Sequence, residues 1–326
     1  MTEKVLEIRD LRVTFETPSG PLEAVRGVDL DVSAGELLGV VGESGSGKSV
    51  SFLATMGLLP ARARVTGSVL LAGEQLIGAS NKYMRSVRGR SLSMIFQDPL
   101  SALNPVHRIG NQIAEMLQSH QDLSKRDAEK RAIELLDIVG IPQPSERATQ
   151  FPHEFSGGMR QRVVIAIAIA NNPKVLIADE PTTALDVTVQ AQILEVIERV
   201  QDRFGTAVVL ITHDLGVIAR VADRVNVMYA GRNVEQGTID SLFDHPSHPY
   251  TRGLLASLPH EGIERLTPIT GFPPNMLMPP PGCGFAPRCS HATDACLVSL
   301  PPLQTFGDLE TACIRAEELV VKAGLS

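Results

Sequence analysis

The stretch "GESGSGKS", Gly42 to Ser49, decides the fold of this chain. It follows a short apolar run and precedes a helical pattern, which is the setting of a phosphate-binding loop. A glycine-rich turn that merely opens a helix is the alternative. Glycines at these positions let successive backbone amides point at one phosphate, and the helix N-terminus adds its positive dipole end. The pattern therefore predicts Lys48 on the β and γ phosphates of a nucleotide, and Ser49 on its Mg²⁺.

A second motif, "VLIADEPTTALD" at 175–186, supplies two adjacent acids. Asp179 ends an aliphatic strand, where it can hold Mg²⁺ through water. Glu180 follows it and can polarise an attacking water. An Asp at a strand end is commonly only a turn cap, but together with the phosphate loop it predicts a site for nucleotide hydrolysis.

Apolar patterns around these motifs predict alternating strands and helices. Strands are expected at 5–15, 36–42, 174–179 and 207–213. One helix presents Ala132, Leu135, Leu136 and Val139 on one face and is capped by Gly140, and another presents Ile193, Leu194, Ile197 and Val200. Buried strands that alternate with helices predict an α/β fold with a largely parallel sheet.

Composition narrows the possible partners and the compartment. The chain has 326 residues, a formal charge of −7 and a pI near 5.7, which gives no basic footprint for nucleic acid. The N-terminus lacks the apolar core of a signal peptide, and the longest apolar run, 163–170, is too short for a membrane helix. We therefore expect a soluble cytoplasmic chain with free thiols.

The segment "EFSGGMRQR", 154–162, resembles the signature of ATP-binding cassette (ABC) proteins, and further motifs follow in the order of that family. Gln97 in "IFQDP" resembles the Q-loop, Asp186 in "ALD" the D-loop and His213 in "ITHD" the switch histidine. Phe15 is a candidate for stacking on adenine. Taken singly, Gln97 could be a surface amide, Ser156 a helix cap and His213 a core histidine. The motifs taken together, in this order, fit the family.

The resemblance implies a P-loop NTPase core with antiparallel β and helical subdomains, the latter at about 98–165. It implies a head-to-tail dimer that sandwiches ATP between Lys48 of one subunit and Ser156 of the other. Glu180 and His213 are then catalytic, and Ser49, Gln97 and Asp179 hold Mg²⁺. The expected ATP-binding residues are Phe15, Gly42, Glu43, Ser44, Gly45, Ser46, Gly47, Lys48, Ser49, Val50, Gln97, Ser156, Gly157, Gly158 and Asp186.

Further stretches resemble one subfamily, the ATP-binding subunits of bacterial oligopeptide and dipeptide importers. They are "QDPLSALNPVHRIGNQI" (97–113), "HPSHPYTRGLLASLP" (245–259), "ITGFPP" and "GCGFAPRC" (282–289). This resemblance implies a second, related ATP-binding subunit, two permease subunits and, indirectly, a solute-binding protein, with the chain at the cytoplasmic face of the inner membrane. Importers of nickel, glutathione or sugar conjugates have very similar subunits, so peptide is the favoured substrate among these.

Two other classes compete with an importer ATPase. A soluble cassette ATPase of translation or DNA repair is expected to carry two cassettes or a long coiled coil, and neither pattern is present. A non-hydrolysing binding module is disfavoured because Glu180 and His213 are both in place.

The four cysteines, Cys283, Cys289, Cys296 and Cys313, all lie in the last part of the chain. A proline-rich change of composition near residue 258 predicts an ATPase domain at 1–258 and an extension at 259–326. The extension looks loop-like and small enough to need a staple. No CxxC pair occurs, which disfavours zinc, and idle thiols remain an alternative.

The family resemblance implies that these four cysteines hold a [4Fe-4S] cluster, which we rank above zinc and above idle thiols. One departure from the family pattern is Gly284, where proline is common. We expect the cluster to be structural or redox-sensing, because nothing in the sequence places it near the phosphate loop.

Overall fold

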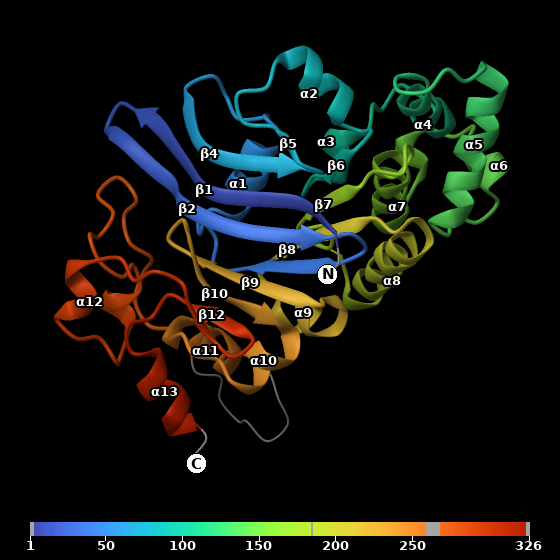
Figure 1. The fold of residues 1–326 in the computed structure, drawn as a ribbon. Helices are drawn as coiled ribbons and strands as arrows, with labels where there is room; N and C mark the ends of the chain where they lie inside the picture. The colour runs from blue at the N-terminus through green and yellow to red at the C-terminus, as the bar shows by residue number, and fades with distance from the viewer. Residues whose placement is uncertain (1–2, 184, 259–267, 324–326) are drawn as a thin grey trace. The chain divides into compact units, whose positions relative to one another are not determined.

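The structure is a computed structural model, and it describes residues 3–183, 185–258 and 268–323 (Figure 1). The chain forms two compact units, each built from segments that are distant in sequence. The first unit comprises residues 1–6, 32–37 and 78–211, and the second comprises residues 7–31, 38–77 and 212–326.

Three parallel strands form the sheet of the first unit. β6 (Leu92–Ile95) pairs with β7 (Val175–Asp179), and β7 pairs with β8 (Ala207–Thr212). All residues of these strands are buried, as expected for a sheet with both faces covered. Parallel pairing brings the C-terminal ends of the strands to one edge, and Asp179 lies at that edge.

Helices make up the rest of the first unit, and several of them gather together in Figure 1. Its longest are α5 (Lys125–Ile138), α7 (Gly157–Ala168) and α8 (Val187–Phe204). The others are α2 (Asn81–Val87), α3 (Pro99–Ala102), α4 (Ile109–Gln118), α6 (Pro144–Arg147) and η1 (Pro152–Glu154). Both predicted helices are confirmed: their predicted faces are buried, and Gly140 ends α5 with a positive φ of 74°.

The second unit contains a mixed sheet. β3 (Leu37–Val41) runs parallel to β9 (Arg224–Tyr229), which pairs antiparallel with β10 (Arg232–Thr238). A separate sheet has the strand order β2-β1-β4-β5. Its strands are β1 (Lys4–Thr17), β2 (Gly20–Ser33), β4 (Ala63–Leu71) and β5 (Glu74–Gln75). The four predicted strands are therefore confirmed. The predicted parallel pairing is also present, but antiparallel strands accompany it.

The C-terminal segment, which we define as residues 268–323, adds strands to the sheet that contains β9 and β10. β12 (Leu309–Thr311) pairs antiparallel with β10, and β11 (Gln304–Phe306) pairs with β12 (Figure 1). The sequence predicts a loop-like extension at 259–326, whereas part of this extension forms β-strands. The domain boundary near residue 258 stays a prediction, and it borders residues 259–267, which lie outside the described residues.

The helices of the second unit are mostly short. They are α1 (Lys48–Thr55), α9 (Leu215–Val221), α10 (Ile239–Asp244), α11 (Pro249–Ala256), η2 (Ala286–Arg288), α12 (Ala295–Val298) and α13 (Ala316–Ala323). Among the described residues, no helix has both the length and the apolar character to cross a membrane.

Candidate functional site: a phosphate-binding loop and an acidic cluster

The phosphate-binding loop connects β3 to α1 in the second unit. Gly42, Gly45 and Gly47 have φ values of 154°, 78° and 98°, which side chains rarely adopt. Space is also limited, because a Cβ at Gly42 would contact the carbonyl oxygen of Met228 and one at Gly47 would lie 2.7 Å from that of Ala24. All three glycines are thus required for the bend, and Gly42 and Gly47 are also required for the close approach of the neighbouring backbone.

Lys48 and Ser46 lie inside this loop with little exposure. The Lys48 Nζ donates to the carbonyl oxygens of Gly42 at 2.7 Å and Glu43 at 3.1 Å. The Ser46 hydroxyl is buried and has no hydrogen-bond partner among the residues that the structure describes. A buried unpaired hydroxyl is costly, and a phosphate oxygen is a suitable acceptor for it. The loop is therefore suited to an anionic ligand.

Glu180 is the centre of a hydrogen-bonded cluster in the first unit. Its carboxylate Oε2 accepts from Gln97 Nε2 at 3.0 Å and from Thr183 Oγ1 at 2.9 Å. Its backbone has a φ of 47°, unusual for a residue with a side chain, and its amide donates to the Ile211 carbonyl at 2.9 Å. The structure thus holds the Glu180 carboxylate in a defined place beside Gln97. The sequence motifs predict a role for each residue but no contact between them.

The signature segment opens α7 in the same unit. Ser156 is the N-cap of α7, and its Oγ accepts from the amide of Met159 at 3.4 Å. Asp186 caps α8 in the same way, through the Val189 amide at 2.9 Å. Ser156 and Gly157 are exposed, so the N-terminus of α7, with its positive dipole end, is open to solvent.

The remaining predicted residues lie as follows. Phe15 is half-buried in β1, and His213 is exposed directly after β8. Glu43, Ser49 and Val50 are half-buried and Ser44 is exposed, all in the second unit. Asp179 is 8% exposed at the end of β7 in the first unit. The predicted site is thus divided between the units: the phosphate-binding loop lies in the second unit, and the Glu180 cluster lies in the first.

The predicted magnesium ligands are a hydroxyl, an amide and a carboxylate, from Ser49, Gln97 and Asp179. Within the described ranges, no group of three or more His, Cys, Asp or Glu side chains is arranged to hold a metal ion. This finding does not bear on Mg²⁺, because the predicted set contains a single residue of those types, and nucleotide phosphates and water complete such sites.

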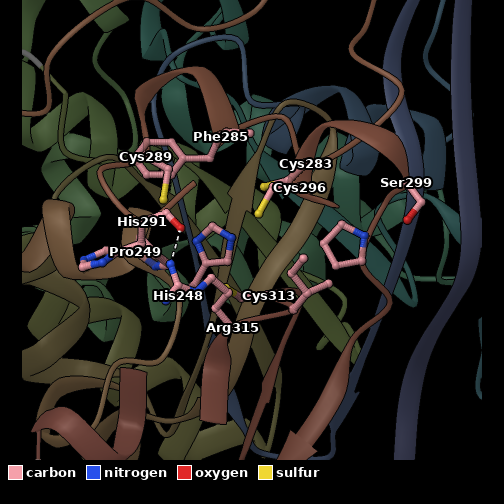
Figure 2. A pocket seen from close by; sticks show the side chains of 13 residues that line it. His248, Pro249, Cys283, Phe285, Cys289, His291, Cys296, Ser299, Cys313 and Arg315 are labelled. Carbon is pink, nitrogen blue, oxygen red and sulfur yellow. Dashed lines mark hydrogen bonds between the residues drawn. The ribbon is translucent and has the colours of Figure 1, made fainter. Parts of the chain in front are cut away.

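The four cysteines line one small cavity, together with His248 and His291 (Figure 2). All four are free thiols in the structure. Their number and kind suit an iron–sulfur cluster. The volume among them is only about 20 Å³, room for about one water molecule. The donors fit the cluster in kind, but as the side chains lie, the described cysteines form no group of three or more that could hold a metal ion, so the structure does not support the predicted [4Fe-4S] site.

Burial disfavours the thiolate form of three of these four cysteines. It raises the pKa of Cys283 and Cys289, and it raises the pKa of Cys313 to about 11, with the neighbouring cysteines adding to the effect. His248 is fully buried, and burial lowers its pKa to about 3.

Two residues that the sequence motifs did not assign hold the phosphate-binding loop. The Tyr250 hydroxyl accepts from the Glu43 amide at 2.8 Å, and Arg288 forms an ion pair with the Glu43 carboxylate at 2.8 Å. Arg288 lies between Cys283 and Cys289 in sequence, so the fold brings the cysteine region to the phosphate-binding loop, which nothing in the sequence indicates. Only the fold reveals this contact, because these residues are far apart in sequence.

Comparison with protein families agrees with this geometry. Residues 25–183 match the ABC transporter family, and residues 234–296 match the C-terminal region of oligopeptide and dipeptide transporters. A solved structure with the same fold is a dimeric ATP-binding cassette in a post-hydrolysis state, bound to ADP and phosphate. It has a TM-score of 0.64 and 26% identity, and the match covers 72% of this chain and 98% of that one.

Several relatives are similar over almost their whole length. The oligopeptide transport ATP-binding protein OppD of Bacillus subtilis is 53% identical, over 94% of this chain and 87% of its own length. The dipeptide transport ATP-binding protein DppD of the same organism is 53% identical, over 90% and 89%. OppD of Escherichia coli is 48% identical, over 98% and 95%. With its phosphate loop, signature helix and Glu180 cluster, the chain belongs to the ATP-hydrolysing subunits of the ABC transporter family.

Proposed function

We propose that this chain energises the import of oligopeptides or dipeptides through a membrane ABC transporter. The observation that carries the proposal is that the similarity continues past the ATPase cassette. Residues 234–296 match the C-terminal region of oligopeptide and dipeptide transporters, and relatives with about half of their residues identical are named for peptide transport.

The geometry supports a hydrolytic mechanism for this role. The phosphate loop amides and Lys48 bind the β and γ phosphates. Mg²⁺ would be held by Ser49, Gln97 and Asp179 and would supply positive charge beside these phosphates. Glu180, oriented by the donors Gln97 and Thr183, accepts a hydrogen bond from the attacking water. His213 is assigned to the γ-phosphate by the family resemblance.

The open N-terminus of α7 supports a site shared between two subunits. Ser156 and Gly157 are exposed at the N-terminus of α7, whose amides can bind a phosphate. Following the family resemblance, we assign them to the ATP of a second ATP-binding subunit. Closure around ATP then drives two permease subunits, and hydrolysis reopens the pair. This arrangement places the chain at the cytoplasmic face of the membrane, with a solute-binding protein as an indirect partner.

Assembly is tested by measuring ATP turnover of the purified chain over a range of concentrations. Turnover per chain should rise with concentration, because each site needs a second subunit. Constant turnover in a preparation that stays monomeric with ATP would contradict the shared site.

The substrate is tested by uptake in cells that lack this chain. Labelled dipeptides and tripeptides should no longer enter, and a plasmid-borne copy should restore their uptake. Nickel, glutathione and a sugar conjugate serve as parallel substrates in the same cells. Loss of uptake for one of these, with peptide uptake intact, would reassign the substrate and leave the ATPase role unchanged.

For the cysteines we propose a shared structural ligand, with a [4Fe-4S] cluster ranked above zinc. The support is that all four thiols line one cavity and none is used in a disulfide. A cluster would require the four side chains to change their present positions, since they form no metal-holding group as they lie.

Anaerobic purification tests this ligand. A cluster predicts a brown protein with iron and sulfide at roughly 4:4 per chain, whereas zinc predicts a colourless protein with one metal ion. A metal-free protein whose four Cys→Ser substitutions leave folding and uptake intact would contradict both.

A further inference from the structure

Arg288 of the C-terminal segment reaches the phosphate-binding loop. Its two terminal nitrogens donate to the two carboxylate oxygens of Glu43, at 2.8 Å and 3.0 Å. The arrangement is bidentate, and the Arg288 side chain is 5% exposed. Paired hydrogen bonds of this geometry fix direction as well as distance, which a surface ion pair does not.

The rest of the guanidinium is held by its own surroundings. Nε donates to the Thr270 carbonyl at 2.9 Å, and one terminal nitrogen donates to the Tyr229 hydroxyl at 3.1 Å. The rings of Tyr229 and Phe285 lie 5.7 Å and 5.8 Å from the guanidinium carbon. These protein contacts fix the orientation of the Arg288 guanidinium.

Glu43 is in turn connected to Lys48. Its amide donates to Tyr250, its carboxylate binds Arg288, and its carbonyl accepts from Lys48 Nζ at 3.1 Å. Every polar group of Glu43 thus takes part in holding the start of the loop. A shift of Glu43 would move the amides that follow it and the carbonyl that now anchors Lys48.

The charge of Glu43 gives Arg288 a second effect. Its carboxylate belongs to a loop whose amides are arranged to receive a triphosphate, and two negative groups at such a site repel each other. The ion pair neutralises the carboxylate and keeps it turned toward Arg288. Hydrogen bonding to Glu43 also raises the pKa of Arg288 further above its usual range, so the guanidinium stays charged at every working pH.

We propose that Arg288 is a positioning residue for ATP binding, which acts through Glu43 by fixing the start of the phosphate loop and by neutralising its carboxylate. Arg288 does not contact the reacting atoms in this role. The C-terminal segment is therefore a working part of the nucleotide site as well as a family marker.

The test is a double-mutant cycle on ATP affinity, with a fluorescent ATP analogue as the probe and steady-state ATPase kinetics of the assembled protein as a second readout. Arg288→Gln should weaken ATP binding by about fivefold or more, because Glu43 is left unpaired beside the phosphates. KM should rise more than kcat falls, since Arg288 acts on binding. Arg288→Gln with Glu43→Gln should recover most of the affinity, because the repelling charge is gone.

Arg315→Gln is the matched control. Arg315 also lies in the C-terminal segment and pairs with a carboxylate, that of Glu318, outside the phosphate loop. It should leave ATP affinity unchanged. Thermal unfolding without nucleotide identifies any variant that fails to fold, and Arg288→Lys, which keeps the charge but loses the paired geometry, should give an intermediate affinity.

Three results would overturn the proposal. One is wild-type affinity in folded Arg288→Gln, and the second is a double variant no better than Arg288→Gln alone. The third applies if Arg288→Gln does not fold: wild-type affinity in folded Arg288→Lys would then show that the paired geometry has no effect on ATP binding.

Discussion

Glu180 combines a strained backbone with a fully oriented carboxylate. A φ of 47° costs a residue with a side chain about 1–3 kcal/mol, and such strain is retained where the surroundings enforce it. Here the enforcement comes from the hydrogen bonds of its amide to Ile211 and of its carboxylate to Gln97 and Thr183. We conclude that the position of this carboxylate is specified more tightly than folding alone requires.

Glu180→Gln should lower kcat for ATP hydrolysis by roughly 10²–10⁴-fold and leave ATP affinity within a factor of about two of wild type. The carboxylate acts on the attacking water, whereas ground-state binding depends on the phosphate loop. Turnover and affinity are measured on the same preparation. Thr183→Val, which removes one hydrogen bond and keeps the carboxylate, is the comparison and should cost far less. Near wild-type turnover in Glu180→Gln would show that another group activates the water.

At this scale, a motif with fixed spacing is what lets the sequence predict a site residue. Lys48 and Glu180 are predicted from short patterns whose chemistry depends on neighbours in sequence. Tyr250 and Arg288 could not be assigned, because their contact with Glu43 spans more than 200 residues and arises only when the chain is folded.

Among the elements, α7 and α8 meet at a glycine. A Cβ at Gly158 would lie 2.6 Å from Val189 Cγ1, whereas a Cβ at Gly157 would have only an ordinary contact of 3.7 Å with Leu185. Packing of α7 on α8 therefore requires glycine at position 158, whereas position 157 has room for a larger side chain.

Gly158→Ala should lower the free energy of unfolding by about 1–3 kcal/mol, because Val189 is stiff and α7 must move away from α8. Adding Val189→Ala should restore most of the loss. Gly157→Ala is the control and should be neutral or slightly stabilising, since alanine favours a helix. Urea unfolding measures all four proteins, and equal effects at both glycines would contradict the packing argument.

Strand β10 carries an unusual acid. Glu235 is fully buried and accepts from the amides of Ser247 and His248 at 2.6 Å and 3.0 Å. Burial raises its pKa from 4.5 to about 7 despite these hydrogen bonds. The folded chain thus binds a proton here that the unfolded chain has already released, and this group's stabilising contribution falls as pH rises from about 4.5 to about 7.

Glu235→Gln keeps the accepting oxygen and cannot ionise. The free energy of unfolding of the variant should therefore not fall through this group as pH rises. Its advantage over wild type should appear above about pH 5 and reach on the order of 3 kcal/mol near pH 8. Unfolding free energies from pH 4 to pH 8 test this, with the exposed Glu129→Gln as control. An advantage that did not change with pH would mean that Glu235 stays ionised when buried.

For the whole molecule, the sequence predicts the fold class because strand and helix periods are strong in both units. It could not predict that β12 pairs with β10, since Leu309–Thr311 is too short to stand out by alternation. The same limit applies to the cysteines: sequence places them in one segment, and folding is needed to bring all four to one cavity.

The central claim is that ATP hydrolysis by this chain energises peptide import. The most direct test is uptake of a labelled tripeptide by cells whose only copy of the chain is wild type or Glu180→Gln, at matched protein levels. The account predicts that wild-type cells accumulate the peptide and that Glu180→Gln cells do not, although the variant still binds ATP. Undiminished uptake in Glu180→Gln cells would contradict it.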